Sequence, residues 1–73
     1  MGLFNGFKKE IYINRLVRNY KLVYNCDDIS AIKNMRTNYN SNELKEIIDE
    51  IKENSNQSLL SLRLLFKDHN SML

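Results

Sequence analysis

Apolar residues recur along this chain at spacings of three and four, which is the period of an amphipathic helix. The clearest run places four aliphatic residues on one helical face: Leu44, Ile47, Ile48 and Ile51. Glu43 follows Asn40 by three residues, the spacing of a capping box, in which each residue bonds the other's backbone amide. The pattern therefore predicts a helix that starts at Asn40 or Ser41 and ends near residue 53.

The stretch before residue 25 has the same spacing. Its apolar face consists of Ile13, Leu16, Val17, Tyr20, Val23 and Tyr24. The apolar residues before residue 12 project to the side of a helix opposite that face. Either the helix breaks near residues 11–13 or one helix touches two surfaces. Isoleucine, valine and tyrosine also suit strands, which leaves a hairpin over residues 10–24 as the alternative. No Asn-Gly or Asp-Gly turn lies between the candidate strands, and helix is preferred.

Two further helices are expected. Asp27 or Asp28 supplies a cap for one of them, since aspartate accepts hydrogen bonds from free amide groups, and its apolar face consists of Ile29, Ile32, Met35 and Tyr39. The other follows a polar break and takes Ser55 or Asn56 as its cap. On it, Leu59, Leu62 and Phe66 share a face, while Leu60 and Leu64 point elsewhere. The sequence predicts an all-α fold: one domain over residues 1–73, a bundle of three to four short helices.

The small size of the chain limits how it can be stabilised. A domain of this length buries only about 60% of the surface that its unfolded chain exposes. Small domains usually add a disulfide, a metal ion or self-association. Cys26 is a lone cysteine and His69 a lone histidine. We therefore expect self-association, most simply as a homodimer, and no cofactor or metal.

Residues suited to catalysis are scarce. Cys26 could act as a nucleophile only beside a base, and nothing in the sequence brings His69 to it. The third predicted helix carries a solvent-facing row of acids with no histidine expected within reach: Glu43, Glu46, Asp49, Glu50 and Glu53. There is no glycine-rich phosphate loop. The sequence predicts a protein that is not an enzyme.

Charge is divided unevenly along the chain. Residues 1–36 hold seven lysines and arginines against three acids, a net charge of +4, whereas residues 37–73 hold four against six, a net charge of −2. The candidate basic face consists of Arg15, Arg18, Lys21, Lys33 and Arg36. Such a face could contact nucleic-acid phosphates or an acidic protein surface. A helix-turn-helix is disfavoured, because its recognition helix would be the acidic one.

The start of the chain gives no sign of export or of a membrane span. It lacks the apolar run of a secretory signal, and the longest apolar stretch is far short of about 20 residues. Residues 2–11 could lie on a membrane surface, but they are few and carry no second anchor. A lone cysteine fits a reducing compartment, so we expect a cytoplasmic protein. Abundant Asn, Lys, Ile and Tyr hint at a low-GC bacterium or its phages and plasmids.

The apolar surface exceeds what one small core can use. This surplus predicts a non-catalytic protein-interaction module, an adaptor or inhibitor that regulates another protein, such as a phage- or plasmid-encoded antagonist of a host enzyme. The candidate contact residues are Phe4, Phe7, Leu60 and Leu64. The alternative function is a small nucleic-acid-binding regulator that uses the basic face.

Overall fold

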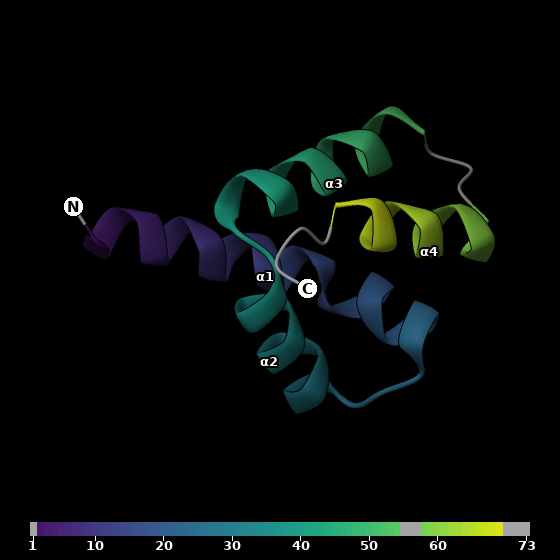
Figure 1. Cartoon of the computed structure of the whole chain (residues 1–73), viewed down its shortest axis with the longest axis horizontal. Coiled ribbons are helices and arrows are strands. Elements are labelled where there is room, and N and C mark those ends of the chain that lie inside the picture. The colour runs from purple at the N-terminus through teal and green to yellow at the C-terminus, as the bar shows by residue number, and fades with distance from the viewer. Residues whose placement is uncertain (1, 55–57, 70–73) are drawn as a thin grey trace.

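The described residues of the chain fold into four helices (Figure 1). In the computed structural model the backbone is described for residues 2–54 and 58–69, and the side chains from residue 7 onward over the same ranges. The helices are α1 (Gly2–Tyr24), α2 (Asp28–Asn38), α3 (Ser41–Glu53) and α4 (Leu59–Asp68). These residues contain no strand, so the prediction of a small all-α bundle is confirmed and the alternative hairpin over residues 10–24 is wrong.

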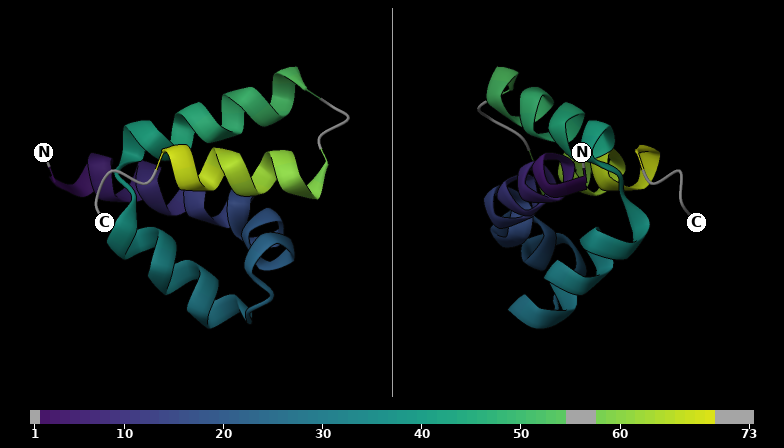
Figure 2. Two further views of the ribbon diagram at one scale, coloured as in Figure 1. Left: turned by 45° about the vertical axis from the view of Figure 1, so that its right-hand side comes forward. Right: turned by 90° about the vertical axis from the view of Figure 1, so that its left-hand side faces the viewer.

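Helix α1 is continuous and forms the axis of the fold. It packs against each of the other three helices, and its N-terminal end extends beyond them (Figures 1 and 2). The break considered near residues 11–13 does not occur. Ile13, Leu16 and Tyr20 are buried on the inner face, while Phe7 and Ile11 are exposed on the outer one. One long helix thus has an inner face for the core and an outer face that no other described helix covers.

Local hydrogen bonds fix where the helices begin and end. Asn25 ends α1 in the left-handed conformation (φ 51°), which asparagine tolerates better than most residues. The Asp27 carboxylate accepts from the Ser30 amide at 2.8 Å, as predicted for the cap of α2. The capping box of Asn40 and Glu43 is also confirmed, with both hydrogen bonds at 2.8 Å. The cap of α4 was predicted wrongly: Ser58 takes this role, one residue before the helix.

The core is built from one face of every helix. Its buried members are Ile13, Leu16, Tyr20, Val23, Ala31, Met35, Tyr39, Leu44, Ile47, Ile48, Leu62 and Phe66. Three residues of the predicted apolar faces are exposed instead: Tyr24 on α1, Ile29 on α2 and Leu59 on α4. Ile29 is 77% exposed, because α2 turns its Ala31 and Met35 side toward the core, and a pattern drawn from large apolar residues overlooks an alanine. Leu59 is also more than half exposed, at the first turn of α4.

Aromatic side chains hold α4 to the rest of the bundle. The ring of Phe66 is fully buried and stands edge-on to Tyr20 and Tyr39, with centroids 5.2 and 6.2 Å away. The Tyr39 hydroxyl donates a hydrogen bond of 2.6 Å to the Phe66 carbonyl oxygen. This carbonyl lies in the last turn of α4, where carbonyls lack intrahelical amide partners. Tyr39, directly after α2, therefore joins the ends of two helices, and its burial raises its pKa above the ordinary value.

Candidate functional site

The exposed leucines of α4 form the candidate contact surface. Leu60 is 66% exposed and Leu64 50% exposed, although the same helix buries Leu62 and Phe66. Leu60 and Leu64 are four residues apart and so lie one turn apart on the same face. We call these two residues the leucine surface. Sequence reasoning picked both, and the structure places them together on the outer side of α4.

A shallow hollow adjoins this surface. It has a volume of about 340 Å³, and its lining includes Leu59, Leu60 and Arg63 of α4 together with Val23 near the end of α1. Three of these four side chains are aliphatic. The hollow extends the apolar surface from α4 onto α1.

The two N-terminal candidates do not join the leucine surface. The side chain of Phe7 is 67% exposed on α1. Figure 1 shows this end of α1 extending from the bundle, on the side opposite the start of α4. The side chain of Phe4 lies outside the described residues. The predicted hydrophobic residues therefore belong to at least two separate surfaces.

The basic residues do not act as one free face. The Arg36 guanidinium binds both carboxylate oxygens of Glu10, at 2.6 and 2.8 Å, and this hydrogen bonding lowers the pKa of Glu10. Lys21 pairs with Asp28 at 2.5 Å. Both pairs hold α2 against α1.

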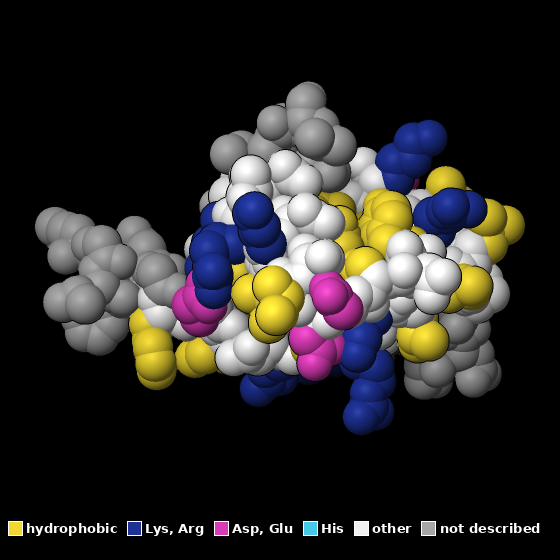
Figure 3. Space-filling view, turned by 90° about the horizontal axis from the view of Figure 1, so that it is seen from below, with side chains coloured by type: hydrophobic (Ala, Val, Ile, Leu, Met, Phe, Trp, Pro, Cys, Tyr) yellow, Lys and Arg dark blue, Asp and Glu magenta, His cyan; other side chains and the backbone are white. Residues whose placement is uncertain are grey.

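The remaining cations of that set are Arg15, Arg18 and Lys33. They are exposed, and they have no ion-pair partner among the residues whose side chains are described. Figure 3 views the molecule from below, and there hydrophobic side chains form several groups with lysines and arginines between them. This view shows neither an unbroken basic area nor a single apolar one.

The acids of α3 lie close to the end of α4, which the sequence did not indicate. The imidazole of His69 lies between two carboxylates, with Nδ1 3.2 Å from Glu46 and Nε2 3.1 Å from Glu50. The expectation that no histidine reaches the acidic row is therefore wrong. His69 follows α4 directly, and the return of α4 along α3 brings it there. Only the tertiary fold could reveal this contact, because the residues are 19 or more positions apart.

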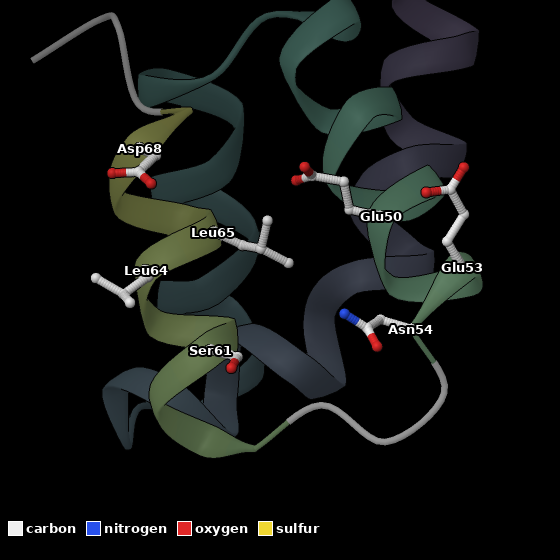
Figure 4. Close-up of a pocket in the computed structure, with 7 residues that line it drawn as sticks. All are labelled: Glu50, Glu53, Asn54, Ser61, Leu64, Leu65 and Asp68. Atoms are coloured by element: carbon white, nitrogen blue, oxygen red, sulfur yellow. The ribbon is translucent and has the colours of Figure 1, made fainter.

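Between α3 and α4 runs a groove of about 480 Å³ (Figure 4). Its lining consists of Glu50, Glu53, Asn54, Ser61, Leu64, Leu65 and Asp68. The two helices are the most lightly packed pair of neighbours in the bundle. The groove carries three carboxylates and no lysine or arginine, so it offers an acidic rim around two leucines.

Other kinds of site find little support in the described part of the chain. No group of three or more His, Cys, Asp or Glu residues there could hold a metal ion. Cys26 is half-buried against the core, and no acid or histidine among the described residues hydrogen-bonds to it. No described helix has both the length and the apolar character needed to cross a bilayer.

Comparison with known proteins adds no relative to this picture: no protein-family model, curated protein or solved structure matches the chain.

Proposed function

We propose that this chain is a non-catalytic protein-interaction module, an adaptor or inhibitor that binds and regulates another protein through the leucine surface of α4. The observation that carries the proposal is the exposure of Leu60 and Leu64 on a helix that already gives Leu62 and Phe66 to the core. In this proposal the protein acts in the cytoplasm, without a cofactor. A phage- or plasmid-encoded antagonist of a host enzyme is one form that it could take.

Leu60 and Leu64 leave apolar area that the fold does not bury. Burying a leucine side chain contributes about 1.5–3 kcal/mol relative to leaving it in water. The fold gains most of this from Leu62, but much less from Leu60 and Leu64. A partner that covers Leu60 and Leu64 would gain the remaining free energy of their burial. Arg63 and Lys67 lie along the same outer side of α4, where they would favour a partner with an acidic rim.

The alternative function, nucleic-acid binding, rests on the exposed cations Arg15, Arg18 and Lys33. Two of the five residues on which it depends, Lys21 and Arg36, are already in ion pairs. Affinity for phosphates rises with the number of cations that neutralise them. The alternative therefore has fewer free cations than the sequence suggested.

The test is capture of a partner by the immobilised protein. Wild type, Leu60→Ser and Ile29→Ser are compared in one lysate of the source organism, with and without nuclease. Ile29→Ser is the matched control, because Ile29 is equally apolar and exposed but belongs to α2. We expect nuclease-resistant capture by wild type and by Ile29→Ser, and its loss with Leu60→Ser. Capture that nuclease abolishes, or that Leu60→Ser retains, would contradict the proposal.

A further inference from the structure

The groove between α3 and α4 has the chemistry to bind a basic, partly apolar helix. In Figure 4 Leu65 points into the space between the two helices and Leu64 lies on the outer side of α4. Both helices carry carboxylates, Glu50 and Glu53 on α3 and Asp68 on α4. Glu53 and Asp68 have neither a hydrogen bond nor an ion pair with any described residue. Glu50 contacts His69 through one oxygen, Oε2. The groove thus presents two carboxylates, those of Glu53 and Asp68, that no described residue neutralises.

The outer face of α1 is complementary to this groove. Four exposed residues lie along it at spacings of four, three and four: Ile11, Arg15, Arg18 and Leu22. We call them the α1 stripe. At 1.5 Å of rise per residue, the stripe is about 16 Å long. Neither arginine has an ion-pair partner among the described side chains.

We propose that the groove between α3 and α4 receives the α1 stripe of a second copy of this chain. Arg15 and Arg18 are three residues apart on one helix, and Glu50 and Glu53 are three residues apart on another, so two charge pairs can form together. One apolar end of the stripe would then lie near Leu64 and Leu65, which are adjacent in the chain, whereas the two ends of the stripe are about 16 Å apart. The proposal thus combines charge complementarity with burial of apolar area that each copy leaves exposed.

The two surfaces cannot meet within one copy. Arg15 lines a hollow beside Ile48 of α3 and Arg18 lines one beside Asp28 of α2, and neither hollow includes a residue of the groove. Figure 4 shows α3 and α4 on either side of the groove, with the remaining helices behind them. A contact between two different surfaces of identical copies is heterologous. It joins copies head to tail, so a dimer is only the first member of the series. This contact goes beyond the proposed function: it shares Leu64 with the leucine surface but does not involve Leu60.

The first test is the mass of the purified, nuclease-treated wild-type protein by analytical ultracentrifugation. Measurements run from about 10 µM to about 1 mM protein, because association follows mass action. We expect the average mass to rise above the monomer value of 8.7 kDa with concentration at about 50 mM salt, and to fall back at about 500 mM as the ion pairs are screened. A monomer at every concentration in low salt would overturn the proposal and leave the groove to another partner.

The second test reverses the charges of each surface separately. One variant carries Arg15→Glu and Arg18→Glu, and the other carries Glu53→Lys and Asp68→Lys. All four positions are exposed, and both new lysines stand in the last turn of a helix, where cations are favourable. Circular dichroism and thermal unfolding check that each variant is folded.

We expect each variant alone to lose at least about tenfold in its association constant, because ion pairs are replaced by like charges. An equimolar mixture should associate again. The acidic stripe of the arginine variant can bind the basic groove of the lysine variant, and the intact stripe of the lysine variant can bind the intact groove of the arginine variant. The control, Lys33→Glu with Lys67→Glu, changes the net charge as much as the arginine variant but lies off the stripe and the groove, and it should associate like wild type. Variants that associate like wild type, or a mixture that stays monomeric, would overturn the proposal.

Discussion

Replacement of Tyr39 by phenylalanine removes a hydrogen bond that ties the end of α2 to the end of α4. The hydroxyl donates to the Phe66 carbonyl over 2.6 Å, and both side chains are fully buried. The substitution keeps the ring and its edge-on contact with Phe66. It therefore isolates the hydrogen bond from the packing.

The expected cost follows from the burial of this bond. A hydrogen bond inside a protein contributes a net of about 0.5–1.5 kcal/mol, and a buried acceptor left without a partner costs about 1–3 kcal/mol. We expect Tyr39→Phe to lower the free energy of unfolding by about 1–3 kcal/mol. A chain of 73 residues has a total of about 4–11 kcal/mol on the usual scale per residue, so the loss is readily measured.

The assay is urea unfolding followed by circular dichroism at neutral pH. Tyr12→Phe is the control: Tyr12 is half-buried on α1, and its hydroxyl has no hydrogen bond to a described residue. The control should change the free energy of unfolding by less than about 0.5 kcal/mol. An equal, small effect of both substitutions would refute the claim that the Tyr39 hydroxyl links the two helices.

The same pair of proteins also tests the effect of alkaline pH. Burial raises the pKa of Tyr39 above its ordinary value of 10.0. The unfolded chain releases this proton near pH 10.0 while the folded protein keeps it, so wild-type stability is unaffected below that pH and falls as the pH rises above it. Tyr39→Phe should flatten this decline without abolishing it, because the pKa of Tyr20 is raised too.

Two smaller perturbations test the ends and edges of the helices. Asn40→Ala removes the side chain that accepts from the Glu43 amide and should lower the free energy of unfolding by about 1 kcal/mol, as measured by thermal unfolding. Asn42→Ala, at an exposed position of α3, is the control and should cost much less. Equal effects of the two substitutions would count against the cap. Arg36→Gln should raise the pKa of Glu10 toward its ordinary value of 4.5, as followed by NMR titration. Because the wild-type pKa of Glu10 is lowered, the pair stabilises the fold above pH 4.5, and this contribution is lost as the pH falls. If Glu10 had the same pKa in wild type and in Arg36→Gln, the pair would not persist in solution.

The sequence predicted the helices well because their signals are local. The apolar stripe of α3 and its capping box lie within a few residues of each other, and both appear as expected. The aspartate cap of α2 is local in the same sense. The long α1 was harder, since its outer apolar residues suggested a break that the structure does not contain.

The contacts between helices could not be predicted from the sequence. The pairing of Arg36 with Glu10 and of His69 with Glu46 joins residues that are more than 20 positions apart. Helical periodicity says which residues share a face, but not which face another helix covers. This is why Ile29 was assigned to the core while Ala31 occupies it, and why the acidic groove between α3 and α4 was not foreseen.

The candidate residues on α4 were found from the sequence for a physical reason. Leu60 and Leu64 lie on the opposite side of the helix from Leu62 and Phe66, so one small core cannot bury both sides. Spacing separates the two apolar sides of this helix, and the structure shows that the side of Leu62 and Phe66 is the buried one.

The most direct test of this account is the free energy of unfolding of dilute Leu60→Ser and Leu64→Ser, measured beside Leu62→Ala. If the first two leucines are left over for a partner, each of their variants should lose no more than about 1.5 kcal/mol, because half or more of each side chain is already exposed, whereas Leu62→Ala should lose about 2–5 kcal/mol. A loss of about 2 kcal/mol or more in both serine variants would show that these leucines serve the fold itself, and the proposed contact surface would have no basis.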